Sequence, residues 1–145
     1  MRPLLVGEDN PLSFDPRHAL YPYPSNCAGH RLCVKIMGLH GHDYLRIFDR
    51  VNLCAGRWFM KEAKQKAEQL FNENTDPTRS FVLLGTKVRD AFSIVGEPFT
   101  RVGRVVLLPH PSGRCRAWNV PGAYERARAI LRDAGVLPPE DRREG

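Results

Sequence analysis

Four short stretches of the chain are rich in Val, Leu and Phe, and longer stretches with more polar residues separate them. Continuous rather than alternating apolarity is typical of strands that are covered on both faces, as in parallel sheets. We therefore predict four strands, at Leu4 to Gly7, Phe48 to Leu53, Phe81 to Gly85 and Val105 to Pro109.

The stretches between these strands carry apolar residues at helical spacing. We predict four helices, the first of which ends at Gly38. Their apolar faces comprise Leu32, Ile36 and Met37; Trp58, Ala63, Ala67, Leu70 and Phe71; Val88, Ala91 and Phe92; and Tyr124, Ala127, Ile130, Leu131 and Ala134. This alternation predicts an α/β fold, a three-layer αβα sandwich with a mostly parallel, four-stranded central sheet. We expect residues 1–137 to form a single domain and residues 138–145, which are Pro-rich and then charged, to form a flexible tail.

Composition narrows the class of protein. The chain has 145 residues, of which 42% are hydrophobic and 26% charged, as in a globular domain rather than a disordered chain or a coiled coil. Its 22 Lys and Arg exceed its 16 Asp and Glu, and the formal net charge of +6 favours a phosphate-bearing partner. No apolar run approaches the ~20 residues that span a bilayer, and no signal peptide precedes the first strand. We therefore expect a cytoplasmic monomer that is not bound to a membrane.

Several common catalytic signatures are missing. The segment Gly85-Thr86-Lys87 lacks the order and the preceding glycine of a phosphate loop, and neither G-x-G-x-x-G nor G-x-S-x-G occurs. The four cysteines form no C-x-x-C pair, so we expect reduced thiols. The segment His40-Gly41-His42-Asp43 is expected to be a solvated loop, with a metal site as the alternative. We predict neither a metal nor a cofactor.

Polar side chains follow the first and the last predicted strands. Glu8, Asp9 and Asn10 come after the first strand, and His110 and Ser112 come after the last. Parallel α/β sheets bind their ligands beyond the carboxyl ends of the strands. We therefore expect one site at this edge of the sheet; the alternative for the first three residues is capping of the segment that follows.

At these strand ends the sequence resembles the uracil-DNA glycosylase superfamily. That family has a Gly-x-[Asp/Asn]-Pro type motif after its first strand and His-Pro-Ser after its last; this chain has Gly-Glu-Asp-Asn-Pro at 7–11 and His-Pro-Ser at 110–112. The segment 50–54 resembles the family's Asn-bearing strand and 82–85 its third strand, so the resemblance covers residues 4 to 134. It implies a DNA glycosylase that flips a uracil or 5-modified pyrimidine and hydrolyses its N-glycosidic bond without metal or cofactor. Neither motif contains a lysine, so a Schiff-base lyase mechanism has no nucleophile.

The chemistry of such a reaction assigns candidate roles. The departing pyrimidine is an anion and the sugar becomes electron-poor, so the site needs a hydrogen-bond donor near the base and a group that positions water. We assign the donor to His110. For the water, counting from Gly7 selects Asp9, counting back from the proline selects Asn10, and Glu8 is a third candidate because one branch of the family has Gly-Glu there.

Further residues are candidates for base and DNA contacts. Asn52 has an amide that can read a flipped pyrimidine, and a satisfied buried amide is its alternative. Leu12 stands where uracil-restricted members have a tyrosine that excludes thymine, which implies access for 5-substituted pyrimidines. The segment 19–24 supplies tyrosines that stack on a base or pack over the core.

The resemblance places DNA contacts after the last strand. Ser112 and Gly113 would contact phosphate, Arg114 would fill the gap left by the flipped base with Arg116 as its substitute, and Trp118 would add stacking. A solvated basic loop is the alternative. Two other functions stay open: a non-catalytic DNA-binding module that reads damaged or modified bases, and a hydrolase of free nucleotides or nucleosides.

Overall fold

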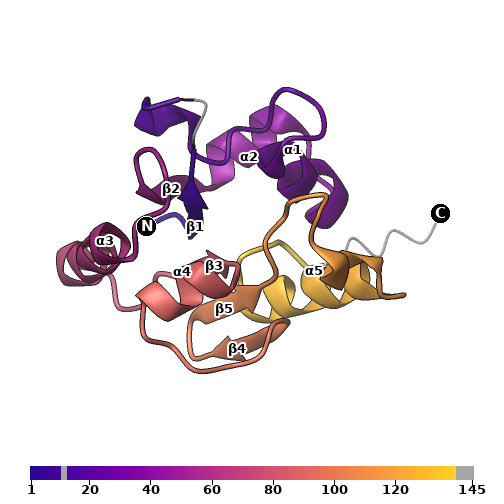
Figure 1. The fold of residues 1–145 in the computed structure, drawn as a ribbon. Coiled ribbons are helices and arrows are strands. Elements are labelled where there is room, and N and C mark those ends of the chain that lie inside the picture. Colours follow the sequence, from indigo (N-terminus) through magenta and orange to yellow (C-terminus); the bar gives the residue numbers. More distant parts are fainter. Residues whose placement is uncertain (11–12, 140–145) are drawn as a thin grey trace.

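Five strands form one sheet at the centre of the computed structural model, which describes residues 1–10 and 13–139 (Figure 1). Their order is β2-β1-β3-β5-β4, and the strands are β1 (Leu4–Asp9), β2 (Asp49–Cys54), β3 (Phe81–Leu84), β4 (Thr100–Val102) and β5 (Val105–Leu108). β1, β2, β3 and β5 run parallel, while β4 pairs antiparallel with β5. The mostly parallel α/β sheet is confirmed.

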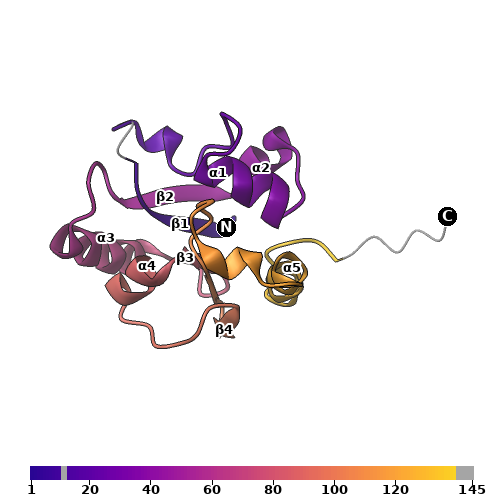
Figure 2. The same ribbon diagram turned by 45° about the vertical axis from the view of Figure 1, so that its right-hand side comes forward.

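Helices cover both faces of this sheet, which explains the continuous apolar runs in β1, β3 and β5 (Figures 1 and 2). Leu5 and Val82 face a core made with η2 (Arg31–Ile36), which directly follows α1 (Ala28–His30), with α2 (Gly41–Ile47) and with α5 (Ala123–Asp133). Leu4 and Val6 face the opposite core, made with α3 (Met60–Glu73) and α4 (Thr86–Ala91). The three-layer arrangement follows from these two cores. No helix in the part of the chain that the structure describes is long and apolar enough to cross a membrane.

Two expectations about the elements were wrong. The sheet has a fifth strand, because the three half-exposed or exposed residues of β4 join the edge of β5 through a tight turn at Gly103, where φ is +60°. A short polar edge strand gives no apolar run, so the sequence pattern did not reveal it. The segment around His42 is not a solvated loop either: it begins α2, and Tyr44 of this helix is buried in the core.

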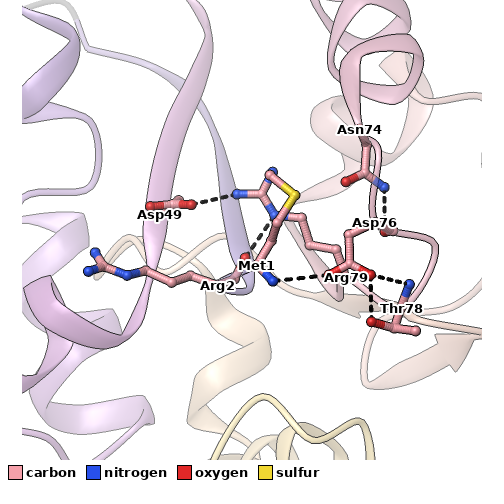
Figure 3. Close-up of polar contacts among 7 residues, drawn as sticks. All are labelled: Met1, Arg2, Asp49, Asn74, Asp76, Thr78 and Arg79. Carbon is pink, nitrogen blue, oxygen red and sulfur yellow. Dashed lines mark hydrogen bonds and ion pairs between the residues drawn. The ribbon is translucent and has the colours of Figure 1, made fainter.

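A polar cluster joins the amino-terminal ends of β1 and β2 to the turn before β3 (Figure 3). The largely buried Arg79 guanidinium donates to the carbonyl of Arg2 and to Asp49, both at 2.7 Å. In the same turn, the Thr78 hydroxyl donates to Asp76 and holds the pKa of this carboxyl well below its ordinary value. These bonds fix the strand ends opposite to the ends that carry the motifs.

Replacement of Arg79 by alanine should lower the free energy of unfolding by about 2 kcal/mol, because two hydrogen bonds of a charged group are lost. The measurement is urea unfolding followed by circular dichroism. Arg2→Ala is the matched control, because Arg2 contributes only its backbone carbonyl to Arg79. Equal losses in the two variants would contradict the role of the Arg79 side chain.

Candidate functional site

A cavity of about 540 Å³ lies at the carboxyl ends of β1, β2 and β5, under the segment that leads into α1. The site residues predicted from the sequence that line it are Glu8, Asp9, Asn10, Asn52, His110, Ser112 and Gly113. Arg114 and Arg116 are exposed and do not line it, and Leu12 lies outside the described residues. The structure therefore brings both motifs and the Asn-bearing strand to one site.

Two hydrogen bonds fix the orientation of the His110 ring and the position of its backbone. The N–H of Ser112 donates to Nδ1 of His110 at 3.1 Å, and the indole N–H of Trp118 donates to the carbonyl of His110 at 2.8 Å. Since Nδ1 accepts a hydrogen bond, the neutral ring carries its proton on Nε2. This Nε2 lies 3.9 Å from a carboxylate oxygen of Glu8, beyond hydrogen-bond distance, and both side chains are partly exposed. His110 thus presents one donor toward the cavity.

Gly85 makes room for this pair. It follows β3, and its φ of +99° is a conformation that side chains rarely adopt. A Cβ here would lie 3.1 Å from Oε2 of Glu8 and 3.3 Å from Cβ of His110. The missing side chain at the end of β3 therefore lets Glu8 of β1 and His110, which follows β5, approach each other across the sheet.

The three candidates for positioning water have different surroundings. β1 extends through Asp9, so Glu8 and Asp9 leave opposite faces of the strand. Glu8 lies toward His110, and the Asn10 amide donates to the carbonyl of His18 at 3.4 Å. The Asp9 carboxylate is half-buried and accepts no hydrogen bond in the described part of the chain. Neither carboxylate is hydrogen-bonded to the described residues, and of the two only Glu8 lies within 4 Å of the His110 ring.

Asn52 lies on β2 directly beside Gly7 of β1. A Cβ at Gly7 would lie only 2.5 Å from Oδ1 of Asn52, so this glycine allows the amide to lie over β1. Within residues 1–10 and 13–139, no hydrogen bond is made by the Asn52 side chain. Asn52 lines the cavity, where an amide can both donate to and accept from a ligand.

The wall opposite the strand ends is irregular chain that two core side chains hold. Leu20, whose φ is +51°, has its carbonyl bound by the buried Tyr44 hydroxyl at 2.7 Å. Arg50 of β2 donates to the carbonyl of Ala19 at 2.8 Å, and its guanidinium lies over the Tyr21 ring. Tyr21 lines the cavity, as does Tyr23. Sequence reasoning missed both anchors, because nothing in the local pattern links them to residues 19–20.

Arg31 is a second residue that sequence reasoning missed. Its guanidinium donates to the carbonyl of Pro111 at 3.0 Å and lies beside Gly113, in the loop that carries His110. The basic residue at the start of η2 gave no signal in the sequence, because its partner is 80 residues away. Arg31 stabilises this loop and adds positive charge next to it.

The loop after His110 differs from expectation in one respect. Trp118 is buried, with 3% of its surface exposed, and it packs between Phe99 and Tyr124. It therefore does not form an exposed stacking surface beside Arg114; its function is to hold the backbone of His110. Arg114 and Arg116 are exposed and form no ion pair in the described residues.

Other reactive groups lie outside this arrangement. All four cysteines are free thiols, and burial raises the pKa of the Cys33 thiol to about 11. No three His, Cys, Asp or Glu side chains of the described residues are placed to hold a metal ion. His42 is exposed and lies 3.5 Å from Asp43. The polar side chains of the cavity therefore define the candidate site.

Comparisons with protein-family models, with curated proteins and with solved structures found no significant match. The fold defines a class, the mostly parallel three-layer α/β proteins with a site at the strand ends.

The ring of His110 should show the tautomer that its contacts dictate. We expect a long-range proton–nitrogen NMR spectrum, recorded at a pH at which the His110 ring is neutral, to show the shift of an unprotonated nitrogen for Nδ1 and of a protonated nitrogen for Nε2. The reason is that the Ser112 N–H donates to Nδ1. His110→Gln assigns the signals. A protonated Nδ1 would contradict the geometry.

Proposed function

We propose that this protein is a monofunctional DNA glycosylase that hydrolyses the N-glycosidic bond of a flipped uracil or 5-modified pyrimidine. The observation that carries the proposal is the convergence in one cavity of a fixed imidazole donor, a half-buried carboxylate and an amide that makes no hydrogen bond to the described residues. The resemblance of the two motifs to the uracil-DNA glycosylase superfamily supports the same function.

The cavity suits a pyrimidine nucleotide. Its volume of about 540 Å³ lies in the range of small-molecule sites. The Asn52 amide can donate to O4 and accept from N3–H of a uracil, and Tyr21 and Tyr23 offer rings for stacking. A base enters such a site only when it leaves the DNA stack, so base flipping is part of the proposal.

His110 acts on the departing base. When the bond from N1 to the sugar breaks, the electron pair of that bond stays on the base and spreads to O2. The Nε2–H of neutral His110 donates to O2 and stabilises this anion. Ser112 and Trp118 hold the ring and its backbone before the reaction, so little reorganisation is needed.

Asp9 positions the water that attacks the sugar. Its carboxylate can accept a hydrogen bond from the water and stabilise positive charge on the sugar, and it then takes up a proton as the new C–O bond forms. Glu8 faces His110 and Asn10 holds the wall at His18, which leaves Asp9 as the available group. The described residues that line the cavity include no lysine that could attack the sugar, so the proposal assigns the attack to water.

The surroundings of the cavity favour a polymer over a free nucleotide. Ser112 and Gly113 line the cavity, Arg31 lies beside Gly113, and Arg114 is exposed next to them. These residues offer backbone, hydroxyl and cationic contacts to phosphates that flank a flipped nucleotide. Arg114 is the proposed side chain that fills the gap in the duplex, and Arg116 is its proposed substitute.

Replacement of His110 by alanine should lower the single-turnover rate of uracil release from duplex DNA by about 100-fold or more, the usual effect of losing a donor to a developing anion. DNA binding should persist. His42→Ala, an exposed histidine of α2, is the matched control. Full activity of the His110 variant would remove His110 from the mechanism, and a protein that shifts DNA without releasing any pyrimidine would support the non-catalytic binding module instead.

The carboxylates can be separated by isosteric replacement. Asp9→Asn should lower the rate of base release by about 100-fold, because the water loses its acceptor, whereas Glu8→Gln should lower it by about tenfold or less. Asn10→Ala should weaken substrate binding more than it lowers the maximal rate. The measurement is single-turnover release at several enzyme concentrations. A larger loss for Glu8→Gln than for Asp9→Asn would assign the water to Glu8.

A further inference from the structure

A second cavity, of about 250 Å³, adjoins the first beyond β2. The two cavities share Asn10, Ser13 and Asn52, so they meet at these side chains. The second cavity lies between the segment that begins at Ser13 and the first turns of α3, which contribute Glu62 and Lys66. Nothing in the proposed reaction uses this space.

Its lining is apolar inside and charged at the rim. Val51, Leu53 and Ala55 contribute apolar surface, and the exposed Glu62 and half-buried Lys66 lie at the outer end. Burial raises the pKa of the neighbouring Cys54 thiol, and the Glu62 carboxylate raises it further, so this carboxylate lies close to the cavity. Because carboxylates and an ammonium group both line this cavity, its charges select neither sign, and the space fits a short carbon chain whose polar end lies among them.

The proposed function fixes the direction in which a bound base points. O2 of the pyrimidine lies at His110, which follows β5, and its N3 and O4 edge lies at Asn52 on β2. In a six-membered pyrimidine ring, C5 is opposite to C2. A substituent on C5 therefore points away from His110, across the sheet order β5-β3-β1-β2, toward the side of β2. The second cavity lies on that side.

We propose that the second cavity is the binding site for the 5-substituent of the excised pyrimidine, and that it accepts a short carbon chain with a terminal hydroxyl. This inference rests on the proposed glycosylase function. It makes residues of β2 and α3, and not only the motif loops, determinants of substrate choice.

Ala55 offers a test, because it lines the second cavity and not the first, and it is exposed. Duplexes that contain uracil, 5-hydroxymethyluracil or 5-(hydroxybutynyl)uracil are compared in single turnover, and the variant-to-wild-type rate ratio is taken for each base. Ala55→Leu should leave uracil release within about twofold and lower release of the hydroxybutynyl base by about tenfold or more, because added volume blocks only the substituent. Ala55→Phe should increase this difference.

Ala129→Leu, an exposed alanine of α5, is the matched control, and melting temperatures verify that the variants are folded. Equal ratios for all three bases would overturn the inference while leaving the glycosylase function intact. The same holds if the wild-type protein releases uracil but neither substituted base. Failure to release uracil or any other base would overturn the proposed function, and the inference with it.

Discussion

The central position of β1 determines where polar side chains meet in this protein. The chain passes from β1 to β2 on one side and then to β3 on the other, so parallel neighbours flank β1 at this change of direction. Because both faces of the sheet are buried, polar groups can gather only beyond the strand ends. Glu8 and Asp9 of β1, Asn52 of β2 and His110 after β5 reach one cavity for that reason. Gly7 and Gly85 then allow the close approach of these side chains.

Two partly buried arginines give this edge of the sheet its electrostatic character. Arg31 and Arg50 donate to backbone carbonyls, and neither forms an ion pair with a carboxylate in the residues described. Carbonyl dipoles accept from some of the N–H groups but do not cancel the charge, and the Nε of Arg50 is buried with no hydrogen-bond partner among the described residues. Arg31 therefore keeps its positive charge beside the loop after His110, and Arg50 keeps its charge at the wall near Ala19. For the proposed glycosylase, such charges would favour a substrate with a phosphate backbone.

The sequence predicted the elements that depend on local pattern and missed those that depend on distant partners. The four parallel strands and the meeting of Glu8, Asp9, Asn52 and His110 follow from apolar runs and from the rule for strand ends. The fifth strand was missed because only its pairing with β5 stabilises three polar or exposed residues. The start of α2 was taken for a loop because the polar segment 40–43 shows no apolar pattern. The buried residue of this helix, Tyr44, comes directly after that segment. The assignments of base, DNA and mechanism stay predictions.

The environment of Trp118 and that of Leu20 show why local pattern cannot place a site in detail. Trp118 stands between basic residues in the sequence, yet its ring is buried between Phe99 and Tyr124 and its N–H holds His110. Leu20 and its neighbours form an irregular wall whose backbone is fixed by Tyr44 and Arg50 from the core. Because these bonds go to main-chain carbonyls, the wall can keep its shape while its side chains change. If the proposed function holds, substrate preference can vary through the wall and the second cavity while Trp118 and the sheet keep His110 and the strand ends in place.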